Sequence, residues 1–218
     1  MLDRTSTAQR VADVLRTRIA DGFFPPGTRL AEDTIGAGLG VSRNTLREAF
    51  RLLTHERLLT HELNRGVFVR VLTVSDVIDL YRVRTLIECA AVRAIERPPL
   101  GVERVAAAVV EGEQATKQLD WQGVGTANIH FHQALAALAG SPRVDELMRG
   151  ILAELRLVFH VMADQRRFSE PYLAGNREIL GRIEAGDGLG AERLLAAYLD
   201  RAQRQLVDAY AQRTAADP

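Results

Sequence analysis

One stretch near the N-terminus constrains the fold most: a glycine-containing turn that leads directly into a short amphipathic helix. Gly40 can supply the tight turn, and Ser42 is a good N-cap for a helix that begins there. Apolar side chains then recur at helical spacing, so one face can be buried while the other points to solvent. Because residues 31–39 also have the pattern of a short helix, the sequence predicts a helix-turn-helix. The buried face of its second helix comprises Leu46, Ala49, Phe50 and Leu53.

The exposed face of this second helix carries the kinds of side chain that recognise DNA. Arginine suits the two acceptors of guanine or a phosphate, asparagine can pair with adenine, and hydroxyl groups donate to phosphate oxygens. An arginine-bearing amphipathic helix is more often an ordinary surface helix, so the neighbouring segments must support the interpretation. The candidate DNA-binding residues of this helix are Ser42, Arg43, Asn44, Thr45 and Arg47.

A β-hairpin is predicted directly after this helix. Residues 58–61 and 66–70 have strand patterns, and residues 62–65 form the turn between them. Arg65 and Gly66 lie near the tip, where an arginine can reach the minor groove and a glycine allows close approach to the sugar-phosphate chain. We therefore expect the hairpin to be the wing of a winged helix.

Length and composition favour two domains and exclude a membrane protein. The chain has 218 residues, of which 47% are hydrophobic, so it can bury one sizeable core and a second, smaller one. No apolar run approaches the roughly 18 residues that a membrane span needs, and the N-terminus lacks the apolar stretch of a signal peptide. We expect a cytoplasmic protein without a membrane partner. The single cysteine, Cys89, is expected to be a small buried residue.

The formal charge is divided unevenly along the chain. Residues 1–70 contain eleven Arg and eight Asp plus Glu, a balance of +3, and the neutral total leaves −3 for residues 71–218. The basic excess therefore lies with the predicted helix-turn-helix. This modest asymmetry supports contact with phosphates but does not establish it.

From about residue 73 onward the sequence predicts only helices. Apolar side chains recur at helical spacing in six segments that are separated by short turns. Short connections between antiparallel helices favour a compact bundle, and a bundle can build a ligand pocket from side chains on facing helices. The predicted helices cover residues 74–96, 101–119, 123–138, 143–163, 169–185 and 189–212, with turns at 140–142, 166–171 and 186–188.

Residues 8–70 resemble the winged-helix domain of the GntR superfamily of bacterial transcription regulators. The matching segments are 24–30, 40–43, 46–49 and 64–66. Two positions depart from the usual pattern: Asp33 replaces a basic or amide residue, and Asn-Thr-Leu at residues 44–46 replaces the commoner Thr-Pro-Val. The residues that the resemblance implies to contact the operator are Arg43, Thr45 and Arg47 on the recognition helix, with Arg65 and Gly66 on the wing.

The rest of the chain resembles the all-helical effector-binding domain of the FadR branch of that superfamily. The matching segments are 80–88, 131–135, 140–143 and 183–187. The expected fold is thus mainly α, with a winged helix-turn-helix in residues 1–72 and an antiparallel helical domain for effector binding and dimerisation in residues 73–218. The resemblance implies a homodimeric regulator, by default a repressor, that binds double-stranded operator DNA and responds to a small-molecule effector.

Many relatives in that branch hold a divalent metal with one Asp and three His side chains. The corresponding positions here are Asn128, His132, Asn176 and Tyr198, so a single imidazole remains. One imidazole with two amides and a phenol is a poor zinc or nickel site. His130 does not restore the site, because two residues along a helix it points to a different face. We therefore expect no metal and no other cofactor.

The four polar side chains should still converge inside the bundle, where unpaired polar groups are costly. Either they pair with one another and with water, or they hydrogen-bond an organic effector. Arg84 is a further candidate because a guanidinium suits a carboxylate ligand, although a salt bridge to Glu88 one turn later is equally plausible. The candidate effector-binding residues are Arg84, Asn128, His132, Asn176 and Tyr198, and the expected effector is a carboxylic acid.

The alternative function is that of an enzyme or a helical metal-binding protein with an appended nucleic-acid-binding module. Catalysis needs a nucleophile with its base, a paired acid and base, or an open metal site. The sequence has no phosphate-binding glycine loop, and Cys89 has no adjacent histidine. We therefore expect a transcription regulator that is not an enzyme.

Overall fold

The computed structural model describes residues 6–159 and 165–216. The chain divides between Leu72 and Thr73 into two compact units, and the last part of one later helix, from Ala153, groups with the first unit. Among the described helices, none combines the length and the apolar character that crossing a membrane would require.

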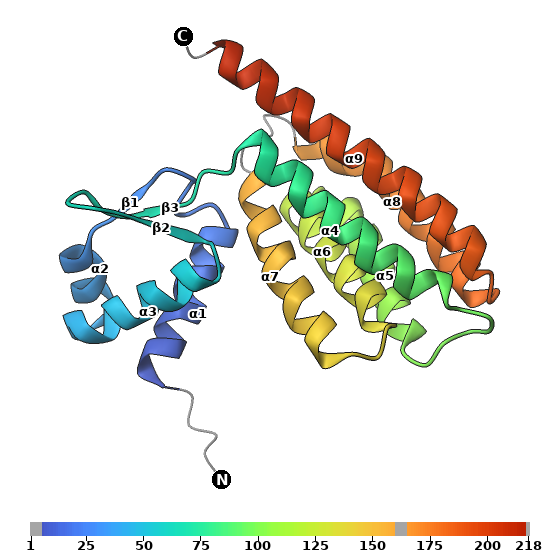
Figure 1. Ribbon diagram of the computed structural model, residues 1–218, viewed down its shortest axis with the longest axis horizontal. Helices are drawn as coiled ribbons and strands as arrows, with labels where there is room; N and C mark the ends of the chain where they lie inside the picture. Colours follow the sequence, from blue (N-terminus) through green and yellow to red (C-terminus); the bar gives the residue numbers. More distant parts are fainter. Residues whose placement is uncertain (1–5, 160–164, 217–218) are drawn as a thin grey trace. The chain divides into compact units, whose positions relative to one another are not determined.

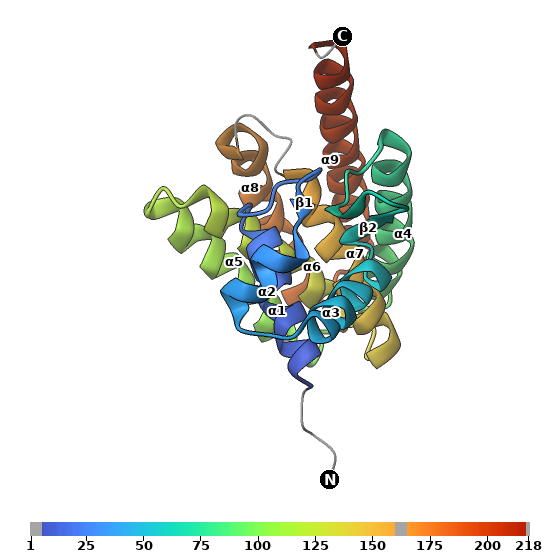
Figure 2. The same cartoon turned by 90° about the vertical axis from the view of Figure 1, so that its left-hand side faces the viewer.

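The N-terminal unit is a winged helix (Figures 1 and 2). Its strands form an antiparallel sheet in the order β1-β3-β2, and helix α1 packs against α3. The elements are α1 (Thr7–Ala20), β1 (Arg29–Leu30), α2 (Glu32–Leu39), α3 (Arg43–His55), β2 (Leu59–Glu62) and β3 (Gly66–Val69). The predicted helix-turn-helix and wing are confirmed, whereas α1 and the short β1 were not predicted.

The turn between α2 and α3 follows from its sequence. Gly40 ends α2 in the left-handed conformation with a φ of 64°, which glycine adopts without a Cβ penalty. The Ser42 hydroxyl then caps α3 by accepting a hydrogen bond from the Thr45 amide at 3.2 Å. The predicted apolar face of α3 is buried in the core of the unit.

The C-terminal unit is a bundle of helices (Figure 1). Thr73 begins it with a capping box, in which its hydroxyl accepts from the Asp76 amide and the Asp76 carboxylate accepts from the Thr73 amide. Helix α4 packs along α9 and α6, and α5 packs along α6 and α8. The helices are α4 (Val74–Arg93), α5 (Val102–Lys117), α6 (Trp121–Ala137), α7 (Pro142–Phe159), α8 (Gln165–Glu184) and α9 (Gly188–Ala216).

One predicted turn in this unit is wrong. The turn expected at residues 166–171 lies inside α8, which continues through Pro171. A proline in a helix interior removes one hydrogen bond and normally favours a break. Here Phe168 and Tyr172 are buried on either side of it, so side-chain packing stabilises the helix where the local sequence disfavours it. The end of the helix expected at 143–163 lies outside the described residues.

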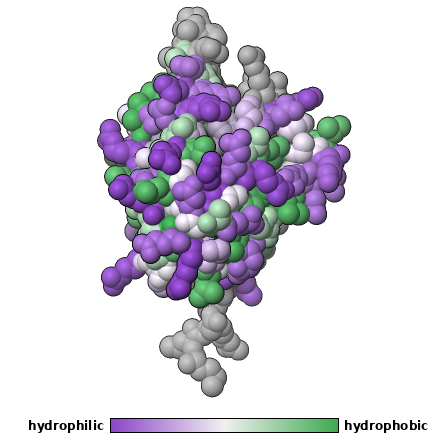
Figure 3. Space-filling view, turned by 90° about the vertical axis from the view of Figure 1, so that its right-hand side faces the viewer, coloured by the Kyte–Doolittle hydropathy of each residue, from purple (hydrophilic) through white to green (hydrophobic). Residues whose placement is uncertain are grey.

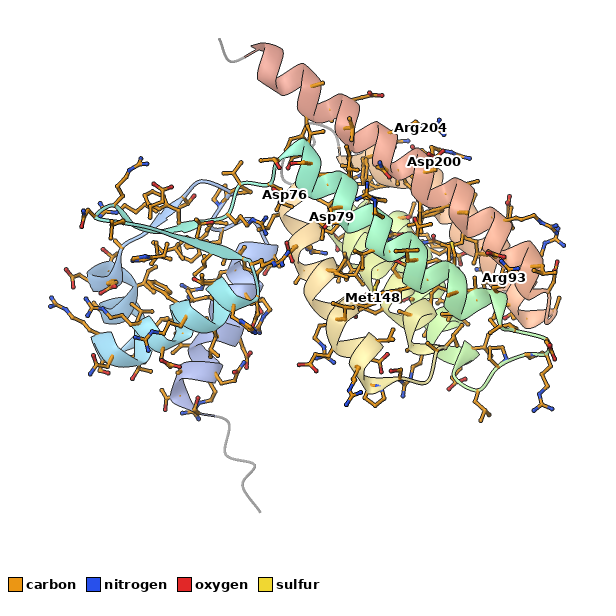
Figure 4. All side chains as sticks on the ribbon, in the orientation of Figure 1. Asp76, Asp79, Arg93, Met148, Asp200 and Arg204 are labelled. Carbon is orange, nitrogen blue, oxygen red and sulfur yellow. The ribbon has the colours of Figure 1, made fainter. Side chains whose placement is uncertain are left out.

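The surface of the helical unit is mixed in character. On the face shown in Figure 3, hydrophobic side chains are interspersed among hydrophilic ones. Long charged side chains also project from α9, where Asp200 and Arg204 form an exposed ion pair one turn apart (Figure 4). Polar groups are common on such a surface, whereas buried polar groups are rare. The polar side chains in the buried centre of the unit are therefore the better candidates for a functional site.

Candidate functional site

The exposed face of α3 carries the predicted DNA-reading arginines, and each is paired with a carboxylate of α2. The side chain of Arg43 is 72% exposed and lies 3.0 Å from Asp33, whereas Arg47 is 61% exposed and lies 3.0 Å from Glu32. Pairs this exposed contribute little stability, so both guanidinium groups can exchange their partners for phosphates or base edges. Asn44 is exposed between them.

Ser42 and Thr45 differ from the arginines because their hydroxyl groups form hydrogen bonds at the start of α3. The Ser42 Oγ lies 2.9 Å from the Thr45 Oγ1 and also caps the helix, so both hydroxyls help to fix the start of α3. Ser42 is exposed and Thr45 is half-buried. These side chains can still donate to phosphate oxygens, but their role in the free protein is to hold the recognition helix.

The wing carries a further exposed arginine, Arg65. Arg65 is 72% exposed, pairs with Glu62, and lies with its Cζ 5.6 Å from the centroid of the Phe68 ring. Gly66 has a φ of 111°, and a Cβ added there would lie 3.3 Å from the Nε of Arg29 on β1. The sequence did not single out Arg29 as a functional residue, because only the pairing of β1 with β3 places it at the wing.

A hollow of about 480 Å³ separates α3 from the wing. Arg47 and Arg51 line it from α3, and His61 lines it from β2. Arg51 therefore continues the row of exposed arginines along α3, at the spacing of one helical turn after Arg47. This spacing was visible in the sequence, but Arg51 was not named as a candidate. Together with Arg65 on the wing, the arginines of α3 give this surface guanidinium groups that can bind a polyanion.

The helical unit holds a second candidate site, a buried polar cluster centred on Glu88. The Arg84 Nε donates to one Glu88 carboxylate oxygen at 2.8 Å, and the His132 Nδ1 lies 2.6 Å from the other. Arg84 is 1% exposed, and Glu88 is fully buried. The guanidinium also lies over the Tyr81 ring, 4.9 Å from its centroid. The salt bridge from Arg84 to Glu88, which the sequence left as an alternative, is present.

The cluster continues from His132 through α9 and α8. The His132 Nε2 lies 3.3 Å from the Tyr198 hydroxyl, which donates to the Asn128 Oδ1 at 2.8 Å. The same oxygen accepts from the Asn176 Nδ2 at 2.9 Å. Side chains from α4, α6, α8 and α9 thus form one hydrogen-bonded chain, so the predicted convergence of the four polar residues is present. Glu88 is the member whose central position the sequence did not indicate.

Both halves of the chain match known families. Residues 7–69 match the profile described as "Bacterial regulatory proteins, gntR family", and residues 79–201 match that of the FCD domain. The crystal structure of a transcriptional regulator, GntR, from Rhodococcus sp. RHA1 is 51% identical, has a TM-score of 0.91, and covers 94% of this chain and 100% of its own. This chain belongs to the GntR family. It is a DNA-binding transcription regulator with an FCD effector-binding domain.

Two relatives of this GntR-family regulator carry the names of operons. The Nta operon transcriptional regulator of Aminobacter aminovorans is 31% identical over 147 residues, which cover 67% of this chain and 70% of that protein. The gluconate operon transcriptional repressor of Bacillus subtilis is 41% identical over 87 residues, which cover 40% of this chain and 35% of that protein. The alternative of an enzyme or a metal-binding protein finds no support in these comparisons.

Burial and neighbouring charges set the protonation of the regulator's cluster. Burial would raise the pKa of Glu88, but Arg84 and His132 beside the carboxylate hold it below its usual value. Burial lowers the pKa of His132 and raises that of Tyr198 well above its usual value. Neutral His132 therefore donates from Nδ1 to Glu88, and Tyr198 keeps the proton that it donates to Asn128.

Two buried atoms of the cluster have no hydrogen-bond partner: the Nη2 of Arg84 and the Oδ1 of Asn176. One is a donor and the other is an acceptor. Leaving such groups unpaired is costly, and they are the kind of groups that an ordered water or a polar ligand satisfies. The central cluster of this GntR-family regulator therefore presents an unused donor and an unused acceptor to any molecule that reaches it.

The divalent metal that the family resemblance implies for many relatives does not fit the residues of this cluster. The Glu88 carboxylate is occupied on both oxygens by Arg84 and His132, and the Arg84 guanidinium would face any cation placed beside it. Tyr198 remains a neutral phenol because burial raises its pKa. Within residues 6–159 and 165–216, no three His, Cys, Asp or Glu side chains are grouped so as to hold a metal ion.

Proposed function

We propose that this regulator is a homodimeric repressor whose operator affinity is set by a small organic acid bound, without a metal bridge, at the central cluster. The observation that carries the proposal is the pair of unsatisfied buried atoms, the Arg84 Nη2 and the Asn176 Oδ1. A carboxylate oxygen can accept from the first, and a hydroxyl group of the same ligand can donate to the second. Repression is the mode named for the gluconate operon relative of Bacillus subtilis.

A dimer is proposed because one recognition helix with one wing reads only a few base pairs. Two winged helices related by a two-fold axis would read a short, roughly palindromic operator. The effector would favour one relative placement of the two winged helices, and only one placement spans both half-sites. The contacts proposed for DNA are made by Ser42, Arg43, Asn44, Thr45 and Arg47 on α3, with Arg65 and Gly66 on the wing.

The acid would bind beside Arg84 and Glu88, whose charges already balance each other. Glu88 balances Arg84, so a carboxylate ligand adds a negative charge that the free Nη2 meets through one hydrogen bond. The Nε2 of neutral His132 can accept a hydrogen bond from a hydroxyl group of the ligand. The proposed contacts of the effector are therefore Arg84 for the carboxylate, with His132, Asn128, Asn176 and Tyr198 for its hydroxyl groups.

Replacing Arg65 by Ala is expected to weaken operator binding and to flatten its dependence on salt. A lost phosphate contact reduces the slope of log affinity against log salt concentration by about 1. Folding should be unaffected, because Arg65 is exposed at a hairpin tip. Fluorescence anisotropy titrations of labelled operator at several salt concentrations measure both quantities. An affinity and a slope equal to those of the wild type would exclude the wing from the DNA interface.

Effector binding is expected to survive removal of metal. The purified regulator should contain no stoichiometric zinc, nickel or manganese by elemental analysis, because one imidazole with two amides and a phenol forms no adequate cage. A thermal-shift screen of small organic acids should give the same stabilisation with and without a chelator. Asn176→Ala should reduce that stabilisation, whereas the exposed control Arg177→Ala should not. One bound metal per chain, or a response abolished by the chelator, would contradict the proposal.

A further inference from the structure

A second polar hollow lies in the helical unit among α5, α6 and α7, with a volume of about 450 Å³. Each of the three helices contributes one stripe of side chains at the spacing of a single helical face. The stripes are Arg104, Ala107, Ala108 and Glu111 on α5, His130, Gln133, Ala134 and Ala137 on α6, and Asp145, Met148 and Arg149 on α7. Three helical faces thus line one hollow that is open to solvent.

This hollow is separate from the central cluster. At about 100° per residue, Asn128 and His132 lie roughly 180° around α6 from the stripe that contains His130 and Ala134. The two sites therefore use opposite faces of the same helix. The hollow is also large enough for a ligand, because small-molecule pockets begin at roughly 300 Å³.

The charges that line the hollow are incompletely paired. The Oδ1 of Asp145 is buried and has no hydrogen-bond partner. Among the described residues, no ion pair forms to Arg104, Asp145 or Arg149, although Asp145 and Arg149 are one turn apart on α7. His130 and Glu111, by contrast, are 2.8 Å apart and satisfy each other. Two cations and one anion therefore face the hollow without partners.

An acidic amino acid has the complementary set of charges. Its ammonium group can donate to Asp145, including the unsatisfied oxygen, and its two carboxylates can accept from Arg104 and Arg149. A ligand charge of −1 then balances the net +1 of the three unpaired side chains. The aliphatic stem would lie against the alanines and Met148, which is 1% exposed on α7 (Figure 4).

We propose that the hollow among α5, α6 and α7 is a binding site for an acidic α-amino acid, separate from the central effector site. Asp145 selects the ammonium group, and Arg104 with Arg149 selects the two carboxylates. The proposal does not depend on the central cluster binding an effector, because the two sites share no side chain.

Isothermal titration of the full chain with L-glutamate and with L-aspartate tests the proposal. We expect one of these amino acids to bind once per chain. The matching dicarboxylate without the ammonium group, glutarate or succinate, should bind at least about tenfold more weakly than the amino acid that binds. The matching amide without the second carboxylate, L-glutamine or L-asparagine, should do the same, because each analogue removes one charge-assisted contact. Absence of binding by both amino acids up to about 10 mM would overturn the proposal.

Two variants and a matched control locate the binding. Arg149→Gln and Asp145→Asn should each weaken binding by about tenfold or more. Arg143→Gln, which removes an exposed arginine on the same helix outside the hollow, should leave the affinity unchanged. Circular dichroism melting verifies that the variants fold. If Asp145→Asn does not fold, the affinities of Arg149→Gln and Arg143→Gln alone decide whether the amino acid binds in the hollow. Equal affinities in Arg149→Gln and Arg143→Gln would place the bound amino acid elsewhere and overturn the proposal.

Discussion

Replacing Glu88 by Gln should destabilise the protein by about 3 to 5 kcal/mol, because it leaves the charge of Arg84 buried without a counter-ion. Glu88 is fully buried, and its two carboxylate oxygens contact Arg84 at 2.8 Å and His132 at 2.6 Å. The glutamine keeps the shape and one acceptor but loses the negative charge. Urea denaturation followed by circular dichroism measures the change in the free energy of unfolding.

An exposed ion pair provides the control for this result. Glu113 pairs with Arg177 on the surface, so Glu113→Gln should cost only about 0 to 1 kcal/mol. Adding Arg84→Met to Glu88→Gln should recover part of the loss, because the unpaired buried charge is then removed. Equal destabilisation by Glu88→Gln and Glu113→Gln would show that the buried pair does not hold the bundle together.

Loss of both recognition-helix arginines should nearly abolish specific operator binding. If Arg43 and Arg47 each read a base edge, each replacement by Ala costs about 1 to 3 kcal/mol, or roughly 5- to 150-fold in affinity. Each arginine must first leave its carboxylate partner on α2, but these exposed pairs are weak. Binding titrations with an operator selected from random DNA, at one fixed salt concentration, measure the single and double variants.

A charge-matched control separates base reading from general electrostatics in this experiment. Arg82→Ala removes the same charge from an exposed position on α4, outside the winged helix. It should change operator affinity little, and neither variant of α3 should alter the unfolding curve. If Arg43→Ala and Arg47→Ala bind the operator as tightly as Arg82→Ala, the proposed docking of α3 is wrong.

The local sequence was sufficient to predict the helix-turn-helix, the wing and the helical character of the remaining chain. Gly40 ends one helix, Ser42 caps the next, and the apolar face of α3 follows the helical period, so these features depend on neighbouring residues alone. The positions replacing the family's metal ligands were also evident, because Asn128, Asn176 and Tyr198 can be read from the sequence. Their roles toward an effector stay a prediction.

Only the tertiary structure decided how distant segments combine. Glu88 is 44 residues from His132, and no local pattern indicates that one carboxylate serves both His132 and Arg84. Arg29 reaches the wing only because β1 pairs with β3, and α8 continues through Pro171 because neighbouring side chains are buried. Helical period and capping are properties of adjacent residues, whereas strand pairing, buried ion pairs and a hollow lined by three helices depend on contacts made after the chain has folded.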